Sequence, residues 1–156
     1  MNFITKILLI VLFNFIVSKV YTTDIPKDLI VKIIKEGEKE DDIKSKNLDL
    51  ISVKYTGWIF DSNAPKNNYC DAKGKMFDSN ILDKFNHTKP FQFVLGKGIV
   101  IKGWDLGLQD MRINEQRCLI IPPHFAYGNR RIGNIIEPNS TLIFEVKLLK
   151  ILKVKK

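Results

Sequence analysis

Alternation of apolar and polar residues with a period of two recurs along this chain, and it constrains the fold more than any other feature. It runs through residues 51–56, 91–95 and 142–148. This alternation is typical of half-buried β-strands. An apolar run over 29–34 is expected as an edge strand, and residues 116–121, which end at a Pro-Pro pair, as a further strand.

The segment 99–111 follows a different period. Four large apolar residues lie at roughly helical spacing there, namely Val100, Trp104, Leu108 and Met111. Gly103 and Gly107 each cost about 1 kcal/mol relative to Ala, so packing of the apolar side must stabilise this helix. The two periods together predict an α+β fold, in which a curved antiparallel β-sheet is wrapped around one short α-helix.

The N-terminus predicts a targeting segment. Lys6 precedes an apolar run over 7–17, which is shorter than the roughly 20 residues that a transmembrane helix needs. Residues 1–18 are therefore expected to be a signal peptide with cleavage between 18 and 23, and an uncleaved anchor is the alternative. The remainder, 24–156, is long enough for one domain and predicts no stable membrane span.

A signal peptide would direct the chain into the secretory pathway, and the two cysteines and two sequons are interpreted for that environment. An oxidising environment permits a disulfide between Cys70 and Cys118, although two free thiols fit the sequence equally well. Asn86 and Asn139 each begin an Asn-x-Thr/Ser pattern and are candidate glycosylation sites.

Composition and motifs exclude several function classes. The net charge of +8 raises the alternative of a nucleic-acid partner, but no basic stripe is interleaved with exposed aromatic residues, and a solvated basic surface is favoured. His87 and His124 lie outside any nucleophile, metal or phosphate-binding motif, and each is interpreted as structural or surface. No metal and no cofactor are expected.

A series of short sequence words carries a family resemblance. In chain order they are Val53-Lys54-Tyr55-Thr56-Gly57, Gly74-Lys75-Met76-Phe77-Asp78-Ser79, Lys89-Pro90-Phe91-Gln92-Phe93-Val94-Leu95-Gly96, Val100-Ile101-Lys102-Gly103-Trp104-Asp105, Ala126-Tyr127-Gly128 and Ile135-Ile136-Glu137-Pro138. In this order and spacing they resemble the FKBP-type peptidyl-prolyl isomerases over roughly residues 28–152. The resemblance extends to the secretory-pathway, single-domain branch of that family.

The resemblance implies a pocket between helix and sheet. The residues implied for catalysis are Trp104 as the floor, Tyr127 through its hydroxyl, Ile101 through its backbone N–H, and Asp78 at the edge. The residues implied for substrate binding are Tyr55, Phe77, Phe91, Val100, Ile135, Ile136 and Phe144. Ile135 and Ile136 are expected to cap the pocket.

The implied activity is cis–trans isomerisation of X–Pro bonds, with no covalent step and no cofactor. Proline-containing peptides, folding proteins and FK506- or rapamycin-class macrolides are the implied partners of a monomer in the endoplasmic reticulum lumen or outside the cell. An FKBP-like chaperone or scaffold with weak or no isomerase activity is the alternative.

The chain departs from the family pattern at several places. Insertions are expected near 61–75 and 80–88, and Lys84 or His87 is the candidate for the basic residue that often pairs with the acid of the pocket. Ile99 makes the rim more apolar than is common. Asn114 stands at a usual turn glycine, where Asn tolerates positive φ.

Overall fold

The computed structural model describes residues 24–39, 43–64 and 68–152. The expected signal peptide, 1–18, and its cleavage region therefore lie outside the described residues. Within the described ranges, no helix combines the length and the apolar character that crossing a bilayer requires.

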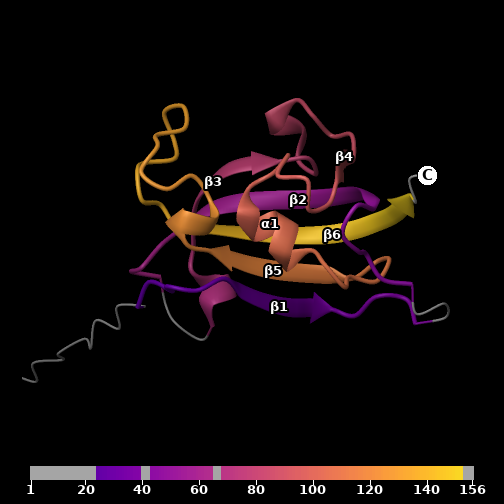
Figure 1. Ribbon diagram of the computed structural model, residues 1–156. Coiled ribbons are helices and arrows are strands. Elements are labelled where there is room, and N and C mark those ends of the chain that lie inside the picture. The colour runs from indigo at the N-terminus through magenta and orange to yellow at the C-terminus, as the bar shows by residue number, and fades with distance from the viewer. Residues whose placement is uncertain (1–23, 40–42, 65–67, 153–156) are drawn as a thin grey trace, which may run out of the picture.

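Six antiparallel strands form one sheet, of which five follow the order β1-β5-β6-β2-β3. The sixth strand, β4, pairs with a different part of β2 than β3 does. Figure 1 shows the strands side by side with a single helix, α1, in front of them. This arrangement confirms the predicted α+β fold. The elements are β1 (Ile30–Lys35), β2 (Leu50–Phe60), η1 (Tyr69–Asp71), β3 (Lys73–Ser79), η2 (Asp83–Phe85), β4 (Phe91–Val94), α1 (Lys102–Gly107), β5 (Gln116–Ile121), η3 (Pro123–Phe125) and β6 (Leu142–Leu152).

The helix is shorter than the predicted segment 99–111 and spans Lys102–Gly107. Its glycines let it lie directly on β5. A Cβ atom at Gly103 would stand 2.4 Å from the Ile121 side chain, and one at Gly107 would stand 2.9 Å from Leu119. Close packing against β5 therefore stabilises a helix whose two glycines lower its intrinsic propensity, as the sequence predicts.

A buried ion pair fixes the C-terminal end of α1. Arg117 on β5 contacts the Glu115 carboxylate through Nε at 2.5 Å, and its Nη1 donates to the carbonyl oxygens of Gly107 at 2.9 Å and Gln109 at 2.6 Å. These carbonyls are among the unpaired acceptors at a helix end. The guanidinium therefore satisfies the end of α1 and joins it to the sheet.

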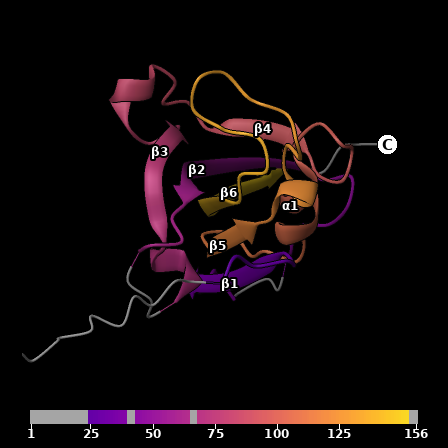
Figure 2. The ribbon, with the colours of Figure 1, turned by 90° about the vertical axis from the view of Figure 1, so that its left-hand side faces the viewer.

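The sheet has two unlike faces. We call the side that α1 covers the helix face and the opposite side the outer face. The helix face buries the main core, which includes Leu108, Met111, Leu119 and Val146. Figure 2, turned by 90°, shows α1 on one side of the curved sheet only.

The predicted insertion near 61–75 covers one end of the outer face. It contains η1 and the first residues of β3, and Cys70 of η1 forms a disulfide with Cys118 of β5. A second apolar cluster surrounds the bridge, consisting of Phe60, Cys70, Ala72, Cys118, Ile120 and Ile143. The described residues of this segment, 61–64 and 68–75, are therefore attached to the domain by packing and by a covalent bond.

Candidate active site

A cavity of about 230 Å³ opens between α1, the sheet and the loops beside them. Its lining residues are Tyr55, Phe77, Asp78, Phe91, Ile99, Val100, Ile101, Trp104, Tyr127 and Phe144. The volume lies below the roughly 300–1,000 Å³ of pockets for drug-sized ligands. The cavity therefore suits one small ring, and the aromatic residues do not fill it themselves.

Trp104 of α1 forms the floor and is 4 % exposed. Its ring meets Tyr55 edge-to-face at a centroid distance of 5.1 Å and Phe144 at 5.2 Å. Phe91 completes the aromatic wall at 6.2 Å from Trp104 and remains 39 % exposed at the mouth. Edge-to-face contacts hold the rings at fixed angles, so the open space between them is maintained.

Gly57 brings two further rings together at one side of the pocket. A Cβ atom there would stand 2.7 Å from the Phe77 ring and 2.8 Å from the Phe144 ring. Those rings lie edge-to-face with centroids 5.4 Å apart. The glycine at this position of β2 therefore permits the aromatic wall to close.

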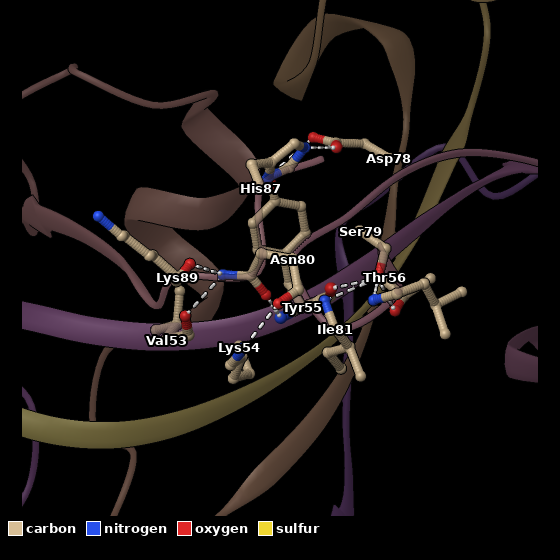
Figure 3. Close-up of polar contacts among 11 residues, drawn as sticks. Val53, Lys54, Tyr55, Thr56, Asp78, Ser79, Asn80, Ile81, His87 and Lys89 are labelled. Carbon is tan, nitrogen blue, oxygen red and sulfur yellow. Dashed lines mark hydrogen bonds and ion pairs between the residues drawn. The ribbon is translucent and has the colours of Figure 1, made fainter. Parts of the chain in front are cut away.

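Asp78 of β3 supplies the acidic edge. Its carboxylate accepts a hydrogen bond from the Tyr55 hydroxyl at 2.6 Å, and its other oxygen lies 2.8 Å from Nε2 of His87. Figure 3 shows the His87 ring facing the carboxylate. Lys84 instead lies over the Phe85 ring at 5.1 Å. Of the two basic candidates, His87 is the one that pairs with Asp78.

Two donors remain available to a ligand. Within the described part of the chain, neither the Tyr127 hydroxyl nor the Ile101 backbone N–H has a hydrogen-bond partner. Ile101 is the N-cap of α1, and its carbonyl already accepts from Trp104. Both groups border the cavity, so each can bind a carbonyl oxygen of a peptide placed there.

Both tyrosines of the pocket are held in the neutral form. Burial raises the pKa of Tyr55 well above its ordinary value of 10.0, and the hydrogen bond to Asp78 raises it further. Burial also raises the pKa of Tyr127, with a second contribution from the negative charge of Asp78 and an opposing one from Arg130. Tyr127 therefore stays a hydrogen-bond donor through the physiological range.

Asn80 aligns the wall from outside the pocket. Its side-chain oxygen accepts from the backbone N–H of Tyr55 at 2.7 Å, and its Nδ2 donates to the carbonyls of Val53 at 3.0 Å and Lys89 at 3.2 Å. Figure 3 shows these bonds bridging β2 and the returning chain. The Asn80 amide thus fills the gap between the β3 and β4 pairings along one edge of β2.

Asp105 has a matching role on the opposite side of the pocket. Its two carboxylate oxygens accept from the backbone N–H groups of Gly96 and Gly98, each at 2.8 Å. Both glycines have positive φ, 76° and 66°, which a residue with a side chain rarely adopts. This clamp fixes the turn that leads into Ile99 and Ile101.

Ile135 and Ile136 belong to the loop next to the cavity. They line an adjoining hollow of about 250 Å³, which shares Phe77, Asp78 and Tyr127 with the pocket. Ile136 is 5 % exposed and belongs to the main core. Backbone bonds between Ile132 and Ile136 hold this loop in a tight turn. That Ile135 and Ile136 cap the pocket stays a prediction.

The structure brings together all the other residues that the resemblance implied for the pocket, and Ile99 lines the same cavity. Sequence reasoning assigned no role to Asn80 or Asp105. Asn80 follows a family word directly, and Asp105 ends one, but their partners are backbone groups distant in sequence. Among the described residues, no group of His, Cys, Asp and Glu side chains could hold a metal ion.

Comparison with known proteins agrees with this geometry. A family model described as FKBP-type peptidyl-prolyl cis-trans isomerase matches residues 41–149. FK506-binding protein 2 of Yarrowia lipolytica is 38 % identical over 147 residues, which cover 93 % of this chain and 91 % of that protein. FK506-binding protein 2B of Rhizopus delemar is 44 % identical over 108 residues, covering 69 % of this chain and 44 % of its own length.

Fold, cavity and family model converge on a proline-binding isomerase domain. The chain belongs to the FKBP-type peptidyl-prolyl cis-trans isomerases.

Proposed function

We propose that the cavity on Trp104 accelerates rotation about X–Pro bonds in proteins that fold in the secretory pathway. The observation that carries the proposal is an open, aromatic cavity of about 230 Å³ with two unused hydrogen-bond donors at its border. Proline is the residue whose ring fits a small apolar site and whose peptide bond isomerises on a biological timescale.

Rotation has a barrier of roughly 18–20 kcal/mol because the planar amide is stabilised by resonance. The twisted amide loses that resonance and much of its charge separation, so water stabilises it less than the planar form. A site formed by Tyr55, Trp104, Phe91 and Phe144 withholds water from the bond. Catalysis then rests on tighter binding of the twisted form than of the planar form.

The unpaired donors hold the peptide on either side of the rotating bond. The Ile101 N–H and the Tyr127 hydroxyl can each donate a hydrogen bond to a carbonyl oxygen of the substrate. Asp78 keeps the Tyr55 ring fixed through their 2.6 Å hydrogen bond and presents a negative edge to the amide. No proton transfer or covalent step is required of these residues.

Several features support action in the endoplasmic reticulum lumen or outside the cell. The Cys70–Cys118 disulfide is of a kind that persists in oxidising compartments. Residues 1–18 have the pattern of a signal peptide cleaved between 18 and 23, and Asn86 and Asn139 are exposed sequon residues available for glycosylation. Expression in a eukaryotic host tests these assignments. N-terminal sequencing locates the cleavage site, glycosidase treatment detects glycans, and thiol labelling before and after reduction detects the disulfide.

Macrolides of the FK506 and rapamycin class are proposed as ligands because relatives carry the name FK506-binding protein. The cavity suits one small ring, so only one part of such a ligand would enter it. The protein is proposed to act as a monomer without nucleic acid. Saturable quenching of Trp104 fluorescence by FK506 would support the ligand assignment. Trp58 lies on the opposite face, so a Trp58→Phe variant isolates the signal.

A protease-coupled assay with a Leu-Pro peptide tests catalysis. We expect Trp104→Leu to lower kcat/KM by about tenfold or more, and Tyr127→Phe, which removes one hydrogen bond, by about three- to tenfold. Lys27→Gln, a change at an exposed residue outside the pocket, is the control. A folded protein with no activity above buffer would reject the enzyme and leave the FKBP-like chaperone or scaffold.

A further inference from the structure

The outer face of the sheet changes character from one end to the other. Strand register arranges its side chains in rows that cross β1, β5, β6 and β2. The first row is apolar and consists of Ile30, Ile120, Ile143 and Trp58. The next contains Lys32, Cys118, Glu145 and Thr56, and the one beyond contains Lys35, Gln116, Lys147 and Lys54.

The insertion that carries η1 covers only the apolar end. Cys70 and Ala72 pack with Ile120 and Ile143 there. Beyond the disulfide, a groove of about 330 Å³ opens over the polar rows. It is lined by Lys54, Thr56, Ile81, Gln116, Glu145, Val146, Lys147 and Leu149.

Positive charge dominates this groove. Lys54 and Lys147 are direct cross-strand partners, an arrangement that is destabilising for like charges. Glu145 is the acidic residue among the described lining residues, and its carboxylate already pairs with Lys73 at 2.5 Å. Lys150, exposed on β6 opposite Ser52, extends the basic surface.

The charge of Lys54 is held in a fixed place. Its Nζ donates to the carbonyl of Asn80 at 2.7 Å and also to the carbonyl of Thr88. Figure 3 shows the Lys54 side chain directed toward the Asn80 backbone. Carbonyl oxygens order the ammonium group without neutralising it, so an anion that binds here meets a cation that has already lost its side-chain freedom.

Apolar side chains flank these cations. Ile81 is 53 % exposed at one lip of the groove, and Leu149 lines it from β6. An acidic peptide with apolar residues complements both features. Nucleic acid would gain no stacking platform from the described residues that line the groove, since none of them is aromatic.

We propose that this groove docks an acidic, apolar-containing segment of a partner protein, on the side of the sheet away from the proline pocket. This groove shares no lining residue with the proline pocket. A partner held there leaves the pocket open, so its own prolyl bonds, or those of a bound client, remain accessible to Trp104 and Tyr127.

The test uses the full-length gene product purified from a eukaryotic host and a fluorescent, proline-free peptide of Glu, Asp and Leu. The matched peptide of Gln, Asn and Leu controls for shape. We expect saturable binding of the acidic peptide, weakened about tenfold by the double variant Lys147→Glu/Lys150→Glu, because each exposed charge pair contributes modestly. The variant Lys27→Glu/Lys39→Glu has the same net charge as Lys147→Glu/Lys150→Glu, changes exposed residues outside the groove and the pocket, and should bind like the wild type.

Thermal unfolding establishes that both variants are folded, and the Leu-Pro assay should give equal isomerase activity for each. As a measurement independent of variants, the acidic peptide should shift the backbone amide resonances of Thr56, Gln116 and Leu149 in the wild-type protein. Equal weakening by the two double variants, or absence of peptide binding, would overturn the proposal. Stronger binding to heparin or to phosphatidylserine vesicles, lost in Lys147→Glu/Lys150→Glu alone, would replace the acidic segment by a polyanion or a membrane.

Discussion

The two faces of the sheet are closed in opposite ways. The outer face has its apolar end filled by an insertion and secured by the Cys70–Cys118 bridge. The helix face must keep an opening for a ligand, and it is fixed at its margins by Arg117, Asp105 and Asn80. The margin of the proline pocket is thus stabilised by directed polar bonds, whereas the apolar end of the outer face is stabilised by close packing and a disulfide.

Removal of Arg117 should have the largest effect on this contrast. We expect Arg117→Ala to lower the free energy of unfolding by about 3–5 kcal/mol, because the buried Glu115 carboxylate loses its partner. Activity should fall as well, since α1 carries Trp104. Urea unfolding and the peptide assay measure the two effects. A loss of stability below about 1 kcal/mol would mean that the ion pair does not secure α1.

Removal of the disulfide should affect the outer face alone. The bridge closes a loop with a sequence separation of 48, and Cys70→Ala/Cys118→Ala should cost about 2–4 kcal/mol of stability. We expect kcat/KM to remain within about twofold of the wild type below the melting transition, since Cys118 faces away from the pocket. A large loss of activity in the folded variant would show that the two faces are coupled.

Titration of Tyr55 offers a smaller effect that is confined to the helix face. The unfolded chain loses this proton near pH 10, whereas burial and Asp78 keep it bound in the folded protein. This stabilisation is complete below about pH 10 and is lost as the pH rises through the raised pKa. Unfolding free energies measured on both sides of pH 10 should show the fall. In Tyr55→Phe, the fall should be shallower, and an unchanged slope would contradict the assignment.

The His87–Asp78 contact should have the smallest effect. The His87 side chain is 49 % exposed, so solvent screens the pair, and we expect His87→Ala to change kcat/KM by less than about threefold. Asn80→Ala is the informative comparison, because it removes three hydrogen bonds behind Tyr55, two of them buried. Equal effects of the two variants would mean that Asn80 does not position the wall.

Periodicity and sequence words predict a large part of this molecule. Alternation locates β2 and β6, helical spacing locates α1, and the glycines of α1 lie where β5 approaches. Asn114 has a φ of 63°, as its position at a turn suggests. These features are local, so a single stretch of chain carries the information.

Other features depend on contacts between distant segments. The choice of His87 rather than Lys84 beside Asp78 follows from how the loop returns through η2, and no sequence period encodes that path. Pairing of Cys70 with Cys118 requires the insertion to fold onto β5, where both lie in one apolar cluster.

The Asn80 amide has a consequence for how the chain can vary. The Asn80 side chain forms hydrogen bonds to β2 that the backbone of a neighbouring strand would otherwise form. Its bond to the Lys89 carbonyl also fixes the point at which the chain returns toward β4. The residues between these anchors can lengthen, shorten or be exchanged while the catalytic wall stays in register. The loop from 81 to 88 is therefore a natural place to graft a recognition segment that would direct the isomerase to a chosen client.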